Sequence, residues 1–324
     1  MDIFEPREGI YPLEYPQFSK YMDAIHEAFW TAEHFTYDRD VTDFKVRLKP
    51  YEQEVVKRAM LAISVVENKV KTFWSRLDMR IPKAEIADVG HTFGGNEVIH
   101  KLAYERLLLL LGLQNEFEKI EEIPAMQGRI SYLNKYLKGI NSRSNKEFTK
   151  SLILFTLLVE NVSLFSQFLI VASFNKHKNV LGNFNSVINA TAREENIHAT
   201  FGAELIKAIK SENPEWFDDE MEEKIVRSVK KAYWAECDVL DWMFEKGELE
   251  FLSKEVVQEY LKFRCNKSLT LIGYEPLFEI DETLKKESDF FDRMTTASIS
   301  FDFFDSKSTD YSETNKITEE AWGS

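Results

Sequence analysis

Cysteine, proline and glycine are all scarce in this 324-residue chain, with 2, 8 and 12 copies. The two cysteines, Cys237 and Cys265, form no Cys-x-x-Cys or Cys/His cluster. Neither a disulfide framework nor a thiolate zinc site is therefore indicated. The Asn-Gly turns that predict β-hairpins are missing as well. Few helix breakers and no hairpin signals predict an all-α protein.

Two further absences exclude whole classes of function. The formal net charge is -14, which argues against a nucleic-acid backbone as the main partner. No uninterrupted apolar run reaches the roughly 18 residues of a membrane span; the densest stretch, 151–174, is broken by Glu160, Asn161 and Gln167. The N-terminus lacks the basic-then-apolar order of a signal peptide. We therefore expect a cytoplasmic protein that acts on neither nucleic acid nor membrane.

The chain divides into a long helical part and a polar end. Proline is tolerated in the first turn of a helix, and the prolines stand where helices would begin. The pattern predicts long helices over residues 50–79, 84–112, 146–174, 181–211, 214–245 and 252–272, and shorter ones near 17–35 and 124–140. Residues 306–324 are polar and lack helical periodicity. They predict a flexible tail that follows a helical domain of residues 1–305.

Two Glu-x-x-His pairs occur far apart in the chain, Glu97 with His100 and Glu195 with His198. Residues three apart on a helix lie on one face, so each pair can point at the same ion. Either pair alone is equally well explained by a histidine that is exposed or hydrogen-bonded. Two pairs on separate helices favour a shared metal site more strongly.

Two further glutamates strengthen the case, because Glu67 and Glu160 each interrupt an apolar run. Burying an unpaired carboxylate costs several kcal/mol, and a metal ion removes that cost. One Glu from each of two helices and Glu-x-x-His from each of two others form the ligand set of ferritin-like di-iron and di-manganese proteins. The sequence thus predicts a ferritin-like four-helix di-metal bundle with additional helices. Oxygen and imidazole ligands suit two Fe or two Mn ions.

Tyr104 lies four residues after His100 and so returns to the same helix face one turn later. An ordinary core tyrosine would explain it. Beside an oxidising metal pair, it becomes a candidate redox residue.

With these motifs the sequence closely resembles the small, radical-generating subunit of class I ribonucleotide reductase, and the resemblance covers nearly the whole chain. Glu97, His100 and Tyr104 match the family's Glu-x-x-His-x-x-x-Tyr. Residues 193–198 match its Arg-Asp-Glu-x-x-His, with Glu194 in place of Asp. The family's early Trp followed by Arg-Asp is matched by Trp30, Arg39 and Asp40. Its late Asn-x-x-Leu-x-x-x-Gly-x-x-x-Leu-Phe is matched by residues 266–278.

The resemblance implies a ligand set and a homodimer. One ion is expected at Glu67, Glu97 and His100, and the other at Glu160, Glu195 and His198. The metal pair reacts with O2 or a reduced oxygen species and stores one oxidising equivalent, which most relatives hold on the tyrosine matching Tyr104.

The resemblance also implies a partner, the large catalytic subunit, which docks on the C-terminal tail and reduces ribonucleoside diphosphates. The oxidising equivalent would leave through Trp30 and exit through Tyr311, the one tyrosine in the tail. Glu194 would join Trp30 to His100 by hydrogen bonds, as groups behind a metal ligand do.

Two departures bear on the choice of metal. Glu67 stands where many tyrosyl-radical relatives have Asp, and Lys71 lies one turn later, on the ligand-bearing face. Lys71 is either a surface lysine or a group beside the cluster that attracts superoxide. This combination resembles the dimanganese subclass, which is activated by superoxide and leaves its tyrosine unoxidised, so Mn/Mn is favoured over Fe/Fe.

Two other functions remain open from the residues alone. One is a ligand-binding oxidase of the same fold or another di-metal oxygenase. The other is metal storage, although storage chains are about half this length and usually form a single bundle. Neither explains Trp30 and Tyr311.

Overall fold

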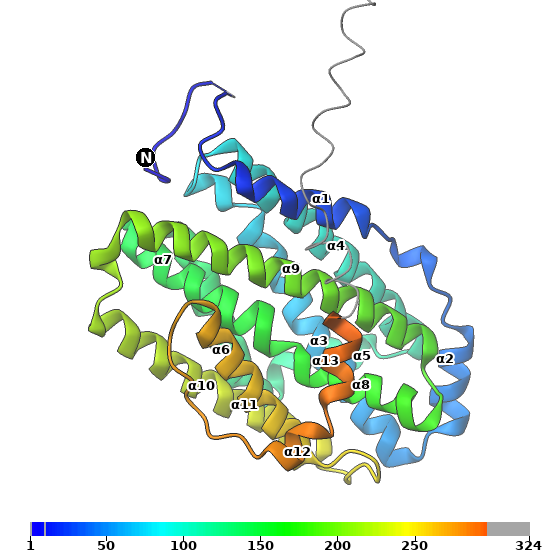
Figure 1. Cartoon of the computed structure of the whole chain (residues 1–324). Helices are drawn as coiled ribbons and strands as arrows, with labels where there is room; N and C mark the ends of the chain where they lie inside the picture. The colour runs from blue at the N-terminus through cyan, green and yellow to red at the C-terminus, as the bar shows by residue number, and fades with distance from the viewer. Residues whose placement is uncertain (1, 10, 297–324) are drawn as a thin grey trace, which may run out of the picture.

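The computed structural model describes residues 2–9 and 11–296 and is built from helices (Figure 1). In this part of the chain the β structure is limited to one isolated antiparallel bridge, between Leu249 and Leu252. The predicted all-α class is confirmed. The α-helices are α1 (Ser19–Glu27), α2 (Asp38–Thr42), α3 (Pro50–Trp74), α4 (Ala84–Leu111), α5 (Gln114–Glu118), α6 (Pro124–Leu137), α7 (Asn145–Leu154), α8 (Phe165–Lys178), α9 (Gly182–Glu212), α10 (Asp219–Phe244), α11 (Lys254–Leu271), α12 (Glu282–Lys286) and α13 (Asp289–Thr296).

Shorter turns connect these helices. Two are π-helical, η3 (Asp43–Arg47) and η7 (Phe155–Ser163). The others are 3-10 turns, η1 (Pro16–Phe18), η2 (Ala32–His34), η4 (Leu77–Met79), η5 (Ile120–Glu122), η6 (Lys138–Asn141) and η8 (Pro214–Trp216).

The centre of the molecule is a bundle of four long helical segments. The α3 helix packs against α4, and α9 packs against α7, η7 and α8, which together form one almost continuous rod. Figure 1 shows α9 running beside α7 and α8, with α1 lying across α4 and α9. Helix α11 covers η7 and α8, and α10 packs against α6, α11 and α3. The additional helices therefore wrap the bundle and keep its interior away from water.

Local sequence signals set the helix ends. Pro50 opens α3, and the Glu52 carboxylate accepts the Lys49 N–H at 2.8 Å, which satisfies a donor left over at the helix start. Helix α4 ends at Gly112, whose φ of 74° favours glycine. The Asp218 side chain accepts the Met221 N–H at 2.8 Å. It therefore starts α10 at Asp219, rather than at 214 as the sequence predicted.

The predicted helix over 146–174 contains a π-helical stretch, η7, in its middle. Two side chains reach back to backbone carbonyls five residues earlier, Asn161 to Thr156 at 3.0 Å and Ser163 to Leu158 at 2.6 Å. Arg264 of α11 then donates to the Asn161 carbonyl at 2.7 Å. Because a π turn shifts the register of the helix, these contacts determine where the Glu160 carboxylate points.

A glycine allows α9 to lie close to this π-helical stretch. A Cβ atom on Gly202 would lie 2.3 Å from Thr156 Oγ1 and 2.6 Å from its methyl carbon. Any side chain at this position would therefore push α9 away from η7. Since both segments carry ligands of the candidate metal site, Gly202 helps to set their separation.

The rod from Asn145 to Lys178 is long and apolar enough to cross a membrane, judged by length and composition alone. Its most apolar window is entirely buried inside the protein. It is therefore a buried core helix in this structure.

Four short helices escaped the sequence prediction, namely α2, α5, α12 and α13. They span five to eight residues, too few for an apolar period to stand out. The predicted helix over 17–35 divides into α1 and η2. The predicted tail, 306–324, with Tyr311, lies outside the described residues.

Glu85 at the start of α4 anchors the N-terminal segment. Its carboxylate accepts hydrogen bonds from Arg7 at 2.8 and 3.1 Å and from the backbone N–H groups of Glu14 and Tyr15 at 2.8 and 3.0 Å. Burial works to raise the pKa of Glu85, but these donors outweigh it and lower the pKa to about 2. The depressed pKa means that the ionised carboxylate stabilises the folded chain.

We expect Glu85→Gln to lower the free energy of unfolding by roughly 2–3 kcal/mol at pH 7. A depressed pKa adds stability that is complete above the unfolded value of 4.5 and fades as pH falls toward about 2. The difference between wild type and variant should therefore shrink by roughly half near pH 3. Urea unfolding at both pH values measures it, with the exposed Glu5→Gln as control. A difference independent of pH would contradict the assignment.

Candidate metal centre

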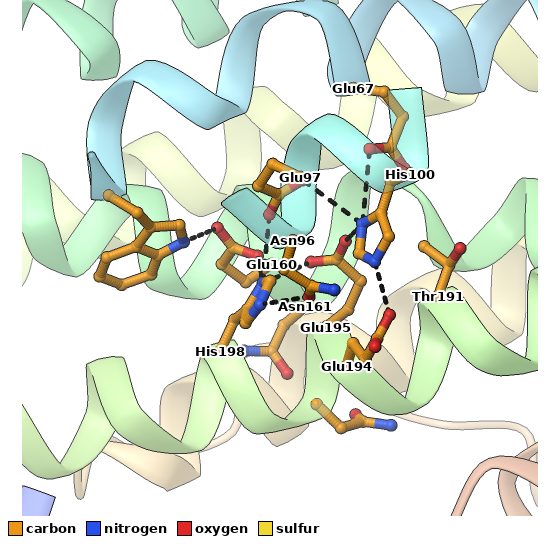
Figure 2. A network of polar contacts seen from close by, with 12 residues as sticks. Glu67, Asn96, Glu97, His100, Glu160, Asn161, Thr191, Glu194, Glu195 and His198 are labelled. Atoms are coloured by element: carbon orange, nitrogen blue, oxygen red, sulfur yellow. Dashed lines mark hydrogen bonds and ion pairs between the residues drawn. The ribbon is translucent and has the colours of Figure 1, made fainter. Parts of the chain in front are cut away.

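The bundle brings six carboxylate and imidazole side chains together in its core (Figure 2). All six are at most 1% exposed. They come from α3, α4, η7 and α9, and they are the residues that the two Glu-x-x-His pairs and the two isolated glutamates predicted: Glu67, Glu97, His100, Glu160, Glu195 and His198. The described part of the chain thus holds four carboxylates and two imidazoles in one water-excluded cluster.

The first half of the cluster is centred on His100. Its Nδ1 atom lies 3.7 Å from Glu67 Oε2, 3.4 Å from Glu97 Oε2 and 3.2 Å from Glu195 Oε1. The ligating atoms of these four residues all lie within 4.8 Å of one another. A single cation could contact all of them.

The second half is centred on His198. Its Nδ1 atom lies 3.1 Å from Glu97 Oε1 and 3.5 Å from oxygens of both Glu160 and Glu195. These four residues form a second group within 4.8 Å. Glu97 and Glu195 belong to both groups and offer one oxygen to each. They are therefore placed to bridge two ions.

The unpaired atoms of the cluster test whether metal ions fit. Both oxygens of Glu67 and Glu97 are buried without a hydrogen-bond partner, as are Nδ1 of His100 and Nδ1 of His198. Buried polar atoms almost always have partners, so this concentration of orphaned acceptors requires an explanation. Oxygen and imidazole donors facing one small space are what divalent Fe and Mn prefer. The residues present therefore fit a two-metal site.

Contacts behind the ligands orient the two histidines. His100 Nε2 lies 2.7 Å from Glu194 Oε2, and His198 Nε2 lies 3.1 Å from Asn96 Oδ1. An acceptor facing each Nε2 favours the tautomer with the proton on that atom, which leaves the Nδ1 lone pair pointing into the cluster.

Burial raises the pKa of Glu67 and of Glu160 well above the usual carboxyl value. Burial works the same way on Glu195, but its close contacts with Glu160 and the two histidines outweigh it and lower the pKa of Glu195. Burial alone would lower the pKa of His100, whereas its carboxylate partners, Glu194 first, raise it. Without a metal ion, protons bound to these side chains balance the negative charge of the carboxylates. Binding of a cation therefore releases protons and becomes tighter as pH rises.

Two residues that hold the ligands were missed by the sequence prediction. Trp74 at the end of α3 donates its indole N–H to Glu160 Oε1 at 2.8 Å, and Asn96 faces His198 as described above. An apolar context explains a buried Trp equally well, and no spacing rule marks an Asn beside a ligand. These partners become visible only when the helices are packed together.

Trp30 approaches the cluster from the segment before η2. Its indole N–H donates to Glu194 Oε2 at 2.9 Å, the same oxygen that contacts His100 Nε2. The Trp30 and His100 rings lie nearly parallel, with centroids 6.0 Å apart. The extra methylene of Glu194, compared with the Asp of the resembled motif, still allows both hydrogen bonds.

Tyr104 is buried beside the cluster, and its hydroxyl donates to Thr191 Oγ1 on α9 at 3.1 Å. Burial, together with the nearby charge of Glu67, raises the pKa of Tyr104 well above its usual value. The phenol is therefore a neutral donor whose proton faces a hydroxyl group. Thr191 was not among the residues that the sequence singled out.

A cavity of about 210 Å³ reaches the cluster at Glu67. Ser64 on the same helix lines it, and Lys101 and Glu105 of α4 with Phe117 form further parts of its wall. Lys71 lies one turn after Glu67 on α3 and is half-buried. The role predicted for Lys71 stays a prediction.

The geometry of the cluster by itself defines a class of protein. Four helical segments supply one Glu, Glu-x-x-His, one Glu and Glu-x-x-His in chain order. That arrangement is typical of the ferritin-like carboxylate proteins that hold two metal ions.

Comparison with known proteins narrows this class to one family. The family model of the ribonucleotide reductase small chain matches residues 7–286. A probable ribonucleoside-diphosphate reductase small subunit of Invertebrate iridescent virus 3 is 21% identical, over 99% of this chain and 88% of its own length. The ribonucleoside-diphosphate reductase subunit beta of Chlamydia pneumoniae is 29% identical, over 46% of this chain and 45% of its own.

Solved structures share the fold. The ribonucleotide reductase R2 subunit from Clostridium botulinum superposes with a TM-score of 0.77 at 19% identity, covering 87% of this chain and 89% of that one. The dimanganese(II)-NrdF of Streptococcus sanguinis gives a TM-score of 0.74 at 16% identity, covering 88% of this chain and all of that one.

The chain belongs to the ribonucleotide reductase small chain family. It is the small subunit of a class I ribonucleoside-diphosphate reductase, which generates the one-electron oxidant and works with a large subunit that makes deoxyribonucleotides. The predicted function is confirmed, and the oxygenase and storage alternatives are set aside by the family match.

Proposed function

We propose that the six clustered residues bind two manganese ions and that the oxidant is held on the metals rather than on Tyr104. Glu67, Glu97 and His100 are assigned to one ion and Glu160, Glu195 and His198 to the other. Glu97 and Glu195 would contribute to both ions, because each offers an oxygen to both groups. When bound, the pair supplies a one-electron oxidant after reaction with superoxide or O2.

The observation that carries the metal-based assignment is the Tyr104–Thr191 hydrogen bond. Oxidation of a phenol requires that its proton move to a base. A threonine hydroxyl is a far weaker base than a carboxylate or imidazole, and the raised pKa of Tyr104 makes loss of the proton harder still. Manganese is supported further by the likeness to the dimanganese(II)-NrdF of Streptococcus sanguinis and by Glu at position 67.

We expect Tyr104→Phe, loaded with manganese and activated by superoxide, to keep reductase activity with the large subunit within about threefold of wild type. The reason is that the phenol is not the oxidant on this proposal. Turnover of a ribonucleoside diphosphate and the electron paramagnetic resonance spectrum are measured together. Loss of turnover, with an organic-radical signal in the wild type that the variant lacks, would place the oxidant on Tyr104.

Glu194 connects the metal cluster to Trp30, the first residue on the proposed electron-transfer route to the large subunit. Its Oε2 atom receives the indole N–H of Trp30 and faces Nε2 of His100. When Trp30 gives up an electron toward the cluster, Glu194 can hold the indole proton without any side-chain movement. On this proposal the bound metals would supply the oxidising equivalent, Trp30 would receive it, and Tyr311 would pass it toward the large subunit.

Lys71 is proposed to attract an anionic oxidant such as superoxide to the cluster from its place one turn after Glu67. A matched test is Lys71→Met, assembled with manganese and superoxide. Assembly at the wild-type rate would contradict this role.

The large subunit is proposed to bind the C-terminal tail, residues 306–324. We expect deletion of this segment to abolish reductase activity with the large subunit while two metal ions per chain remain bound. The clustered residues lie on α3, α4, η7 and α9, so removing residues 306–324 should not change the metal content. Metal analysis and turnover are measured on the same sample. An undiminished turnover would contradict the docking role of the tail.

We further propose a cytoplasmic homodimer. Helix α4 exposes four large apolar side chains, Val98, Leu102, Leu109 and Leu110, at 41–52% of their surface. They recur at helical spacing and so form a stripe, which is typical of a surface buried in an assembly. A monomeric mass by light scattering would contradict this assignment.

A further inference from the structure

A second pocket, of about 540 Å³, opens between α6, α7 and α10. Five of its lining residues are cations: Lys135 from α6, Lys150 from α7, and Lys224, Arg227 and Lys231 from α10. Among the described residues that line it, none is acidic. This is unexpected in a chain with 55 acidic and 41 basic residues. The pocket shares no residue with the metal centre.

The cations of α10 gather on one face of the helix. Lys224, Arg227 and Lys231 follow one another at spacings of three and four residues, so their side chains are neighbours. Like charges at this spacing repel and weaken a helix. A bound anion would convert this repulsion into attraction.

Carboxylates outside the pocket neutralise three of the five cations. Lys224 pairs with Glu220 at 2.7 Å, Arg227 with Glu223 at 4.0 Å, and Lys150 with Glu147. Lys135 and Lys231 form no ion pair within residues 2–9 and 11–296. Two exposed ammonium groups, on facing helices, therefore remain available over the same hollow.

The floor of the pocket is formed by buried tyrosines and carries no unbalanced charge. Tyr132 and Tyr136 line it, with ring centroids 5.8 Å apart. The Tyr132 hydroxyl donates to Glu236, whose charge is already balanced by a buried pair with Arg129. Glu236 therefore does not cancel the positive charge of the rim.

We propose that this pocket binds a small polyphosphate anion, of the kind carried by inorganic tripolyphosphate and by nucleoside triphosphates. Lysine presents a compact charge on a flexible stem and binds phosphate well as a point charge. Several phosphates in a row offer negative charge to cations on three helices at once. A pocket of about 540 Å³ can hold a small anion but not the length of an extended acidic peptide. This site goes beyond the proposed function and does not depend on it.

Calorimetric titration of the full chain tests the proposal. The ligands are inorganic tripolyphosphate, ATP and hexaglutamate, each at low and at physiological salt. The test variant is Lys135→Gln with Lys231→Gln, which removes the two cations without an ion pair. The control variant is Lys138→Gln with Lys230→Gln, which makes the same charge change at exposed lysines of the neighbouring surface that do not line the pocket.

We expect saturable binding of tripolyphosphate and ATP, weakened at least about tenfold in the test variant and changed less than about twofold in the control. Equal affinity for the two ligands identifies the phosphate chain as the recognised group, and tighter ATP binding adds a contribution from the base. The proposal is overturned by absence of saturable binding, by binding of ATP alone, by hexaglutamate binding as tightly, or by equal weakening in both variants. The titration requires neither the metals nor the large subunit, so its failure is separable from failure of the proposed function.

Discussion

Glu195→Ala should remove metal from both positions of the cluster, whereas Glu67→Ala should remove it from one. Glu195 contributes an oxygen to each group of ligands, while Glu67 belongs to the His100 group alone. After equilibration with Mn(II) and desalting, we expect about two ions per chain in the wild type, about one in Glu67→Ala and about none in Glu195→Ala. Elemental analysis measures this directly, and reductase activity should be lost in both variants.

A matched control separates loss of a ligand from loss of the fold. Glu105 is an exposed glutamate on α4, the helix that carries Glu97 and His100. Glu105→Ala should keep about two ions per chain. Thermal unfolding followed by circular dichroism shows whether each variant is folded. A folded Glu195→Ala that still binds two ions would contradict the bridging assignment.

Trp30→Phe should lower reductase activity with the large subunit by more than about 100-fold, equivalent to a barrier roughly 2.7 kcal/mol higher. Phenylalanine is much harder to oxidise than tryptophan, and it leaves Glu194 Oε2 without the indole donor that now lies 2.9 Å away. The metal ligands are untouched, so metal content should stay at the wild-type level. Turnover and elemental analysis on one sample measure both effects.

The control for this change is Trp234→Phe on α10. Trp234 is 65% exposed, and the substitution repeats the chemistry without affecting the cluster. It should leave turnover and metal content unchanged. If Trp30→Phe kept its turnover, the route from Glu194 through Trp30 would be wrong. If it lost its metal, Trp30 would instead be supporting the cluster.

The six residues that gather in the core could be singled out from the sequence, because their spacing and their apolar surroundings are visible there. A helix places residues three apart on one face, so Glu-x-x-His is visible without coordinates. Glu67 and Glu160 stand out because carboxylates in apolar runs are costly unless something pairs with them. The long helices α3, α4 and α9 were predicted because strong helix formers fill them and no proline follows their first turn.

The geometry around the ligands could not be predicted, because it depends on contacts between distant segments. Trp74 reaches Glu160 only after α3 and η7 are packed together. The π-helical turn that carries Glu160 is held in part by Arg264, which lies more than 100 residues later. Thr191 on α9 accepts a hydrogen bond from the Tyr104 hydroxyl on α4. No sequence pattern predicts this hydrogen bond.

The basic pocket was missed for a different reason. The net charge of -14 describes the whole chain and hides a local excess of basic side chains. Lys135 and the cations of α10 are almost 100 residues apart in sequence and come together only in the fold. A charge summed over the chain therefore argues against a general nucleic-acid partner, but it says nothing about a compact anion site.

The most direct test of the metal centre is a crystal structure of the Mn(II)-loaded protein with anomalous data collected on both sides of the manganese edge. Two manganese peaks per chain are predicted, one contacting Glu67, Glu97, His100 and Glu195, and the other contacting Glu97, Glu160, Glu195 and His198. A single peak, or peaks bound by other residues, would contradict the two-metal site on which the proposed function rests.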